Sequence, residues 1–239
     1  MTHAIPGRGP VREALRAGRH LLEVVLDDRD VEELEAISAA AKGASVRVRR
    51  APRAALDELS SGVLHQGAVA VAPTFPYIDL AAIGDTDLVV VLDGVTDPQN
   101  LGGIARSAEA AGAGALVLPR RRSATVGPAA EKAAAGAFGW LRVALVPNIT
   151  RALADLAGRG FWTVGLTQEA GQPVWSSPLL DGKVALVAGS EGRGLSRLVA
   201  ERVDGLVAIP QLGQLESLNV GAAVAIALFE VTRRRSMPG

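Results

Sequence analysis

The sequence predicts an α/β protein with a mostly parallel sheet, preceded by a second, smaller α/β unit. From residue 87 onward, short apolar runs alternate with helical segments of about 10–15 residues, which is typical of a parallel sheet. Residues 87–93 (DLVVVLD) are almost continuously apolar, as in a strand covered on both faces. Residues 73–86 are rich in Pro and Gly, and we expect few contacts to cross this linker.

The N-terminal unit, residues 1–72, is expected to be a small αβαβαβ arrangement. Its strands are expected at 23–28, 45–50 and 67–72, and its helices at 8–18, 30–43 and 53–59. Asp30, with Glu33 three residues later, has the pattern of a capping box that starts the second helix. Residues 45–50 (SVRVRR) alternate between apolar and basic, as in a half-buried strand.

The larger unit is expected to span residues 87–239. Its strands are expected at 87–93, 115–119, 141–146, 162–166, 183–189 and 205–210, and its helices at 100–112, 128–137, 149–158 and 217–235. The last helix is apolar or small nearly all the way round from Gly221 to Leu228. Such a helix is expected to be buried on more than one side.

Composition excludes several classes of function. The 239 residues contain no cysteine and only three histidines, which excludes disulfides, thiolate metal sites and a cysteine nucleophile. No apolar run approaches the roughly 18 residues that a membrane span needs, and the N-terminus has no apolar signal core. We therefore expect a cytoplasmic protein without a metal site. The 25 basic and 25 acidic residues balance to a net charge of zero, so any nucleic-acid contact must come from local basic patches.

Three common α/β signatures are missing. The chain has no phosphate-binding loop of the form GxxxxGK[ST], no GxSxG nucleophile elbow and no GxGxxG after a strand. Three other segments follow predicted strands, where open α/β sheets bind their ligands. In the first, LDGVTDPQNLGGIARSAEAAG (92–112), Asn100 enters a helix that carries Arg106. An Asn N-cap followed by a surface arginine would explain the same pattern.

The second segment, VALVAGSEGRGLSRLV (184–199), runs from a buried strand into a turn with three glycines and one carboxylate, Glu191. Either the glycines let the backbone approach a ligand, or this is a flexible turn with a solvated glutamate. In the third, AIPQLGQLESLNVGAAVAIALFE (208–230), Ser217 and Asn219 enter the last helix. Ser217 has the alternative role of an ordinary N-cap.

The three segments, in this order and at these intervals, resemble the SpoU branch of the knotted (SPOUT) RNA methyltransferases, which methylate the ribose 2′-hydroxyl. The resemblance covers essentially the whole chain. In the N-terminal unit, GRGPVREAL (7–15) and HQGAVA (65–70) are similar to the ribosomal-protein-like substrate-binding domain of 23S rRNA guanosine 2′-O-methyltransferases. The resemblance implies a C-terminal α/β-knot domain with a parallel sheet and a trefoil knot, and a homodimer through the first and last helices of that domain.

The resemblance also implies the site. The matching catalytic positions are Asn100, Arg106, Glu191, Ser217 and Asn219. The methyl donor would be S-adenosylmethionine, contacted at Gly189, Ile209 and Leu218, and, with a weaker match, Thr167. Because the resemblance implies an RNA substrate, the basic clusters become candidate phosphate contacts. These are Arg47, Arg49, Arg50, Arg120, Arg121 and Arg122. Arg53 and the triplet Arg233, Arg234 and Arg235 are further candidates.

The chemistry needs a base that removes the ribose hydroxyl proton. The resemblance suggests that Arg106, oriented by an RNA phosphate, helps in this step. Alternatively, Arg106 stabilises the developing alkoxide while Glu191 or water takes the proton. We treat Arg106 as essential and leave its exact role open.

Two positions and one stretch depart from the family's usual pattern. Gln211 replaces a methionine, Gly221 replaces a serine, and KAAAGA (132–137) stands where a serine-containing stretch is common. The substrate that we favour is a guanosine in 23S rRNA. The alternative substrates are a tRNA and an rRNA adenosine. The alternative function is that of a catalytically silent RNA-binding protein that assists ribosome assembly.

Overall fold

The computed structural model of the protein describes residues 2–29, 31–214 and 217–236, and the chain forms two compact units. Unit 1 comprises residues 1–76, 101–106 and 125–140. Unit 2 comprises residues 77–100, 107–124 and 141–239. Asp30, the expected N-cap of the second helix, lies outside the described residues.

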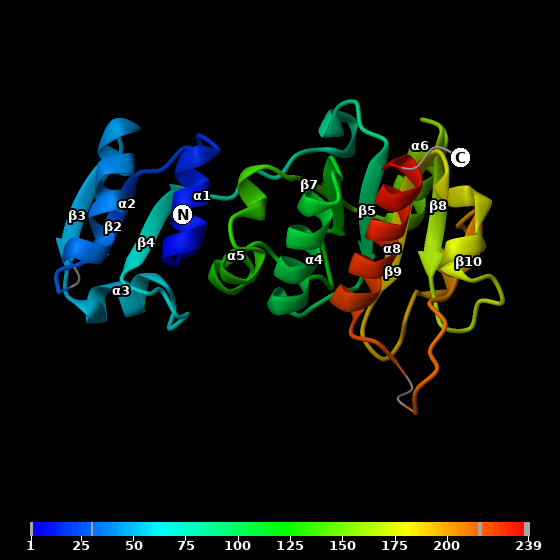
Figure 1. Ribbon diagram of the computed structural model, residues 1–239. Helices are drawn as coiled ribbons and strands as arrows, with labels where there is room; N and C mark the ends of the chain where they lie inside the picture. Colours follow the sequence, from blue (N-terminus) through cyan, green and yellow to red (C-terminus); the bar gives the residue numbers. More distant parts are fainter. Residues whose placement is uncertain (1, 30, 215–216, 237–239) are drawn as a thin grey trace. The chain divides into compact units, whose positions relative to one another are not determined.

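Unit 1 contains a four-stranded mixed sheet in the order β1-β4-β2-β3 (Figure 1). Its elements are β1 (Thr2–Pro6), α1 (Arg8–Arg16), β2 (Glu23–Asp27), α2 (Val31–Gly43), β3 (Arg47–Ala51), α3 (Arg53–Leu59) and β4 (Ala68–Pro73). β2 and β3 are parallel, whereas β4 runs antiparallel to both of its neighbours. The expected αβαβαβ order was wrong at its start, because the sequence reasoning assigned no strand to residues 2–6.

The strands of unit 1 send alternate side chains to the two faces of the sheet, as the pleat requires. Val24 and Leu26 belong to an apolar cluster that includes residues of α1 and α2. Val25, between them, belongs to a second cluster with Leu56 of α3. Two separate cores therefore cover the sheet of this small unit.

Unit 1 also contains the short helix α5 (Pro128–Ala134) and the 3₁₀ turn η2 (Ala137–Gly139), which come from much later in the chain. The helix expected at 128–137 ends early, because Ala135 and Gly136 have positive φ angles of 52° and 104°. α5 carries Glu131, which is fully buried. Both Nε2 of His3 (2.7 Å) and the guanidinium of Arg19 (2.8 Å) donate to its Oε1.

Unit 2 contains a six-stranded sheet in the order β10-β8-β9-β5-β6-β7, and every strand pair in it is parallel. The strands are β5 (Leu88–Asp93), β6 (Ala115–Pro119), β7 (Arg142–Val146), β8 (Phe161–Leu166), β9 (Lys183–Gly189) and β10 (Gly205–Val207). Residues 88–92 of β5 are fully buried. The prediction of a parallel sheet with a strand covered on both faces is confirmed.

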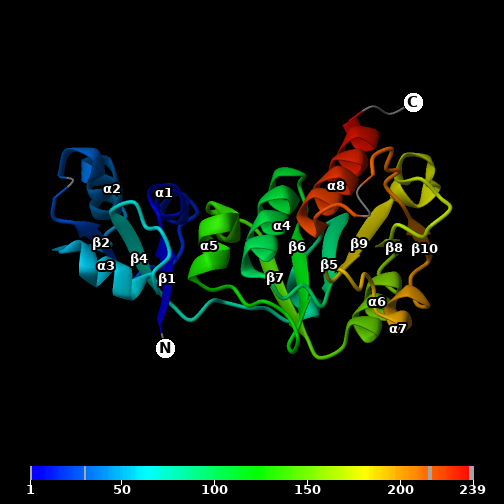
Figure 2. The same cartoon turned by 90° about the horizontal axis from the view of Figure 1, so that it is seen from below.

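Helices cover both faces of this sheet (Figures 1 and 2). α4 (Pro98–Ala110) and α8 (Val220–Ser236) lie on one face, and α6 (Ile149–Ala157) and α7 (Arg197–Ala200) lie on the other. Val89 and Val91 of β5 pack in the cluster on the α6 side. No helix within the described residues is long and apolar enough to cross a membrane.

The second half of the expected linker is part of unit 2. The backbone N–H of Ile78 donates to the carbonyl of Val143 at 2.9 Å, and Ile78 accepts from Leu145 at 3.1 Å. The 3₁₀ turn η1 (Leu80–Ile83) follows, and Ile83 is fully buried in the core. The expectation of few contacts therefore does not hold from Ile78 onward, because this segment extends the edge of the sheet beside β7.

Candidate active site

The carboxyl ends of β5, β9 and β10 meet at one edge of the sheet of unit 2, because the strands are parallel. The three segments singled out in the sequence start there, after Asp93, Gly189 and Val207. This is the edge at which open α/β sheets bind ligands.

The segment after β9 is a tight turn that carries Glu191. Ser190 and Gly194 exchange two backbone hydrogen bonds of 3.0 and 2.9 Å. Gly192 and Gly194 have positive φ angles of 76° and 64°, a region that favours glycine. Gly189 has no room for a side chain, because a Cβ there would lie 2.0 Å from the carbonyl carbon of Gly194. The glycines thus build one particular turn, and this argues against the flexible-turn alternative.

Asp93, the last residue of β5, ties the far side of this turn to the sheet. Its Oδ2 accepts a hydrogen bond from the backbone N–H of Ser196 at 2.7 Å. In the strand ladder, Asp93 faces Gly189, where the turn begins. The turn is therefore held at both of its ends. Sequence reasoning missed Asp93, although a carboxylate that ends a buried strand at this edge was a usable signal.

The side chain of Asn219 connects all three segments. Its Nδ2 donates to Oδ1 of Asn100 and to Oε1 of Glu191, at 2.9 Å each. Its Oδ1 accepts from the backbone N–H groups of Gly221 (2.9 Å) and Ala222 (3.2 Å) at the start of α8. A carboxamide can do both, because it has two donor hydrogens and an acceptor oxygen.

Two alternatives from the sequence are thereby wrong. Ser217 is not the N-cap of the last helix, because Asn219 has this role and α8 begins at Val220. Asn100 is not the N-cap of α4, because Asp97 accepts from the backbone N–H of Gln99 at 3.0 Å. Asn100 lies within the first turn of α4 and is 9% exposed. Because it does not cap the helix, its side chain can take part in the cluster with Asn219 and Glu191.

Arg106 and Ser217 are exposed and do not join this cluster through a hydrogen bond. Arg106 lies on α4, six residues after Asn100. Within the part of the chain that the structure describes, no hydrogen bond or ion pair involves Arg106 or Ser217. Their guanidinium and hydroxyl groups are free to bind a substrate.

A pocket of about 400 Å³ lies where the segments after β8 and β10 come together. Its lining residues are Gln168, Ala170, Gly171, Pro173, Ala208, Ile209, Pro210, Gln211 and Gly213. The two walls are joined by backbone hydrogen bonds, from Ala208 N–H to Gln172 O (2.9 Å) and from Val174 N–H to Ala208 O (2.8 Å). Of the expected cofactor residues, Ile209 lines this pocket.

The other three expected cofactor residues lie outside the lining. Thr167 directly precedes Gln168, the first lining residue after β8, and its backbone N–H donates to the carbonyl of Val207 at 3.0 Å. Gly189 ends β9, and Leu218 is 38% exposed in the segment before α8. Gln211, one of the departures from the family pattern, lines the pocket with a polar side chain. Gly221, another departure, contributes only its backbone to the Asn219 cap.

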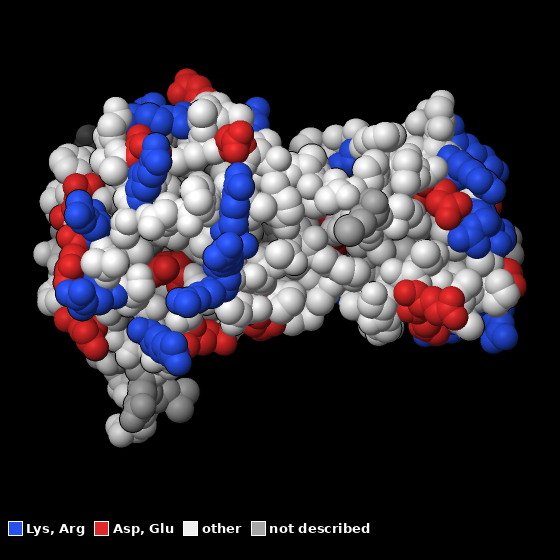
Figure 3. Space-filling model, turned by 180° about the vertical axis from the view of Figure 1, so that it is seen from behind, with Lys and Arg blue, Asp and Glu red and all other residues white. Residues whose placement is uncertain are grey.

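The expected RNA-binding arginines differ in exposure and in their contacts within the chain. Arg49 of β3 is paired with Glu23 at 3.2 Å, and Arg50 donates to the carbonyl of Asp27 at 2.9 Å. Arg47 is exposed. Arg120, Arg121 and Arg122 are exposed in the segment after β6, and Arg120 has a carboxylate of Asp79 at 4.0 Å. On the face in Figure 3, basic side chains lie among acidic ones, in keeping with the zero net charge.

The triplet at the end of α8, also a candidate set of phosphate contacts, makes contacts within unit 2. Arg233 and Arg234 are paired with Glu230 on the same helix, and Arg235 donates to the carbonyls of Asp87 (2.8 Å) and Gly182 (3.1 Å). Arg234 and Arg235 thereby link α8 to other segments of unit 2, whereas the described contacts of Arg233 stay within the helix.

Comparison with known families agrees with this site. Residues 87–229 match the SpoU rRNA methylase family, and residues 4–78 match the RNA 2′-O ribose methyltransferase substrate-binding family. The chain belongs to the SpoU rRNA methylase family. The first match contains every residue of the Asn100, Glu191 and Asn219 cluster.

The similarity to known relatives covers both units of the chain. The chain is 39% identical over 244 residues to the 23S rRNA (guanosine-2′-O-)-methyltransferase RlmB of Escherichia coli, covering 99% of this chain and all of the relative. The SpoU methyltransferase AviRb of Streptomyces viridochromogenes, solved with AdoMet, is 24% identical with a TM-score of 0.83, covering 98% of this chain and 91% of AviRb. A solved RNA 2′-O ribose methyltransferase is 26% identical with a TM-score of 0.81, covering 99% and 90% of the two chains.

Proposed function

We propose that this SpoU-family protein transfers a methyl group from S-adenosylmethionine to the 2′-hydroxyl of a guanosine ribose in 23S rRNA. The observation that carries the proposal is the cluster of Asn100, Glu191 and Asn219 at the carboxyl edge of the sheet. RlmB of Escherichia coli, which is 39% identical over its full length, supports the choice of substrate. Because ribosomal RNA is the substrate, we assign the protein to the cytoplasm.

The pocket supports the choice of cofactor. Its volume of about 400 Å³ is in the range of small-molecule sites, and its two walls come from the segments after β8 and β10. Ile209, Gln168 and Gln211 would contact S-adenosylmethionine, with Thr167, Gly189 and Leu218 contributing from neighbouring segments. When bound, the sulfonium supplies an activated methyl group.

The chain's own residues would prepare the acceptor hydroxyl. Asn219 holds Glu191 and Asn100 in fixed positions, so that a carboxylate and an amide are presented at one edge. Arg106, with a free guanidinium, would bind the phosphate next to the reacting ribose and stabilise the developing alkoxide. Glu191 or water would accept the proton. Ser217 would orient the ribose by a hydrogen bond.

Arg106 provides the test of this mechanism. Arg106→Ala should abolish methyl transfer to 23S rRNA but leave calorimetric binding of S-adenosylmethionine within about twofold, because the side chain serves the RNA. Arg106→Lys should restore little activity, since an ammonium lacks the planar fork of donors. Arg202, also exposed, offers a control in Arg202→Ala. Near-normal turnover of Arg106→Ala would contradict the assignment.

We also assign RNA binding to exposed basic side chains on both units, namely Arg47 in unit 1 and Arg120, Arg121 and Arg122 in unit 2. Arg49 and Arg50 are partly committed to pairs within unit 1. Replacing Arg121 and Arg122 by Ala should weaken binding of a 23S rRNA fragment and lower its salt dependence. Retained affinity and salt slope would remove them from the interface. Ribose-methylation mapping of rRNA and tRNA in a deletion strain identifies the nucleotide.

The family resemblance suggests a homodimer, and α8 offers an apolar face for it. Ile226 and Phe229 are 40% and 50% exposed, and the exposed Ala222 lies one turn before Ile226 and two turns before Phe229. Ala227, by contrast, is fully buried within its own chain. Phe229→Glu should therefore yield monomers in sedimentation experiments, with folding retained. A stable Phe229→Glu dimer would place the interface elsewhere.

The resemblance also suggests a trefoil knot. Support comes from the chain's path: β10 lies at the edge beyond β8, yet the following segment returns so that α8 packs against β9. Pulling the chain from both ends should leave it shorter than a fully extended chain of the same length. Full extension would contradict the knot.

A further inference from the structure

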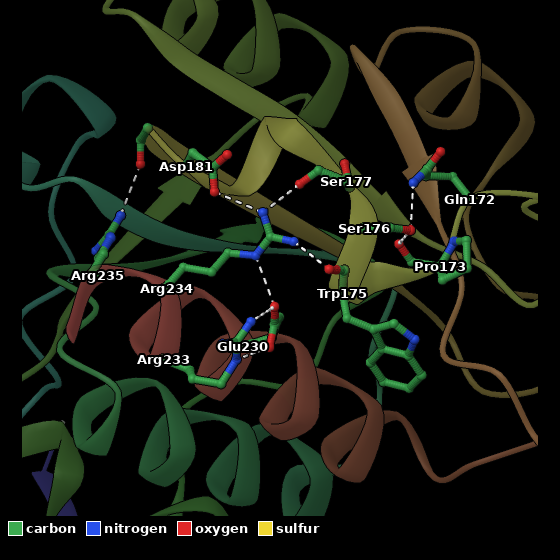
Figure 4. A network of polar contacts seen from close by, with 11 residues as sticks. Gln172, Pro173, Trp175, Ser176, Ser177, Asp181, Glu230, Arg233, Arg234 and Arg235 are labelled. Carbon is green, nitrogen blue, oxygen red and sulfur yellow. Dashed lines mark hydrogen bonds and ion pairs between the residues drawn. The ribbon is translucent and has the colours of Figure 1, made fainter. Parts of the chain in front are cut away.

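The guanidinium of Arg234 joins the end of α8 to the segment that follows the pocket wall (Figure 4). Its Nε donates to Glu230 on the same helix at 2.8 Å. One terminal nitrogen donates to the carbonyl of Ser177 (2.9 Å) and to Oδ1 of Asp181 (2.7 Å), and the other donates to the carbonyl of Trp175 (2.7 Å). Its side chain is only 16% exposed.

The segment that Arg234 binds consists of two short 3₁₀ turns, η3 (Val174–Ser176) and η4 (Pro178–Leu180), and forms no strand ladder. Ser177 between them is 2% exposed. A buried carbonyl that loses its donor is destabilising, because it has already given up its water. Loss of Arg234 would leave the carbonyls of Trp175 and Ser177 without these hydrogen bonds, and the segment would shift or admit water.

This segment continues directly into the pocket wall. Pro173 and Gly171 line the pocket, and Val174 donates to the carbonyl of Ala208 in the opposite wall. The side chains reinforce the connection, because Gln172 Nε2 donates to Ser176 Oγ at 2.8 Å and this hydroxyl donates to the carbonyl of Pro173 at 3.2 Å (Figure 4). A shift of the segment would therefore move one wall of the pocket relative to the other.

We propose that Arg234 is a positioning residue for the pocket: by holding residues 174–181, it fixes the wall at 171–173 against the wall at 208–213. The identity of the ligand, S-adenosylmethionine, rests on the proposed function. The positioning itself rests on the contacts of Arg234 and can be measured without a ligand.

The chain contains a matched control in the neighbouring Arg233. Arg233 also makes two hydrogen bonds of 2.8 Å to Glu230, but its side chain is 55% exposed. None of its interactions within the described residues reaches the segment 174–181. Substituting Arg233 removes one charge and one ion pair from the same turn of α8, with no effect on the carbonyls of Trp175 and Ser177.

The experiment compares Arg234→Met with Arg233→Met in the full-length protein. Calorimetric binding of S-adenosylmethionine should be about tenfold weaker for Arg234→Met, equivalent to about 1.4 kcal/mol, and within about twofold of wild type for Arg233→Met. Without ligand, the amides of Val174 and Ala208 should exchange hydrogen faster in Arg234→Met alone. Arg234→Lys should be intermediate, because an ammonium replaces only some of the four hydrogen bonds.

The outcomes separate this inference from the proposed function. Failure of the wild-type protein to bind S-adenosylmethionine would contradict the proposed function, while the exchange data would still decide the positioning role. Unchanged exchange at Val174 and Ala208 in Arg234→Met would overturn the positioning role. Equal affinities of the two Met variants would overturn it as well. If Arg234→Met fails to fold, the pair Arg234→Lys and Arg233→Lys takes its place, with the same expected order.

Discussion

Two carboxylates, one in each unit, are similar in their hydrogen bonding and opposite in their surroundings. Glu131 of unit 1 accepts on Oε1 from His3 and Arg19, and Glu191 of unit 2 accepts on Oε1 from Asn219. In both, Oε2 has no hydrogen-bond partner among the described residues. Glu131 is fully buried, whereas Glu191 is exposed. The same group therefore joins segments in the core of one unit and lies exposed at the carboxyl edge of the sheet in the other.

Of the two carboxylates, Glu191 is expected to have the larger effect on turnover. Glu191→Gln keeps the oxygen that accepts from Asn219 but cannot take a proton or carry a negative charge. We expect methyl transfer to fall by about 100-fold or more, the scale of a lost acid–base group. The free energy of unfolding should change by less than about 0.5 kcal/mol, as at exposed positions. Single-turnover assays and urea unfolding measure the two quantities. A variant with normal turnover would contradict a role for the carboxylate.

At Glu131 the pattern should reverse. Glu131→Gln leaves Arg19 and His3 against a neutral amide in the core of unit 1, and breaking a buried pair typically costs about 3–5 kcal/mol. Turnover per folded molecule should stay within about twofold of wild type. The double variant Glu131→Leu with Arg19→Met should recover part of the stability, because no unpaired charge remains. An equally stable Glu131→Gln would show that the ion pair contributes little.

A smaller effect on turnover is expected at Asp93. Asp93→Ala removes the acceptor for Ser196 N–H and loosens the turn that carries Glu191. Turnover should fall about tenfold, with Asp93→Asn restoring most of it, since an amide oxygen still accepts. Asp97→Ala is the matched control: it removes another carboxylate–backbone bond, at the cap of α4, and should cost about 1 kcal/mol of stability. Equal losses of turnover in both would contradict a specific role for Asp93.

The smallest effect concerns pH. Hydrogen bonds and charge from Arg233, together with those from Arg234, lower the pKa of Glu230 from 4.5 to about 2. The folded state therefore favours the ionised carboxyl, and this contribution is complete above pH 4.5 and lost as the pH falls toward 2. Glu230→Gln should remove that part of the acid dependence in unfolding experiments. An identical acid dependence in wild type and variant would contradict the shifted pKa.

Most elements of the larger sheet could be predicted because their local signals agree with their tertiary roles. The strands at 115–119 and 183–189 have the predicted bounds, since uninterrupted apolar runs mark strands buried on both faces. Residues 2–6 were missed because His3 is a polar residue on a buried position of a short strand. Its partner Glu131 lies 128 residues later, and no local pattern indicates such a contact.

The site shows the same limit. The three segments could be singled out from the sequence because each follows a strand. The residues Asn100, Glu191 and Asn219 were indicated by the resemblance to SpoU methyltransferases. That Asn219 both caps α8 and binds the other two side chains could not be predicted, because this depends on the return of the chain from β10. The contacts of Arg234 and Asp93 were hidden for a similar reason, since most of their partners are backbone atoms distant in sequence.

The membership of α5 in unit 1 has a consequence for exchanging substrate-recognition modules between relatives. Residues 125–140 lie inside the 87–229 methylase match, yet they pack with β1 and α1. A chimera joined within residues 73–86 would pair a foreign module with the native α5, and it would separate Glu131 from His3 and Arg19. We expect a functional graft to need a second junction pair around residues 125 and 140, so that the recognition module is inherited as a discontinuous block.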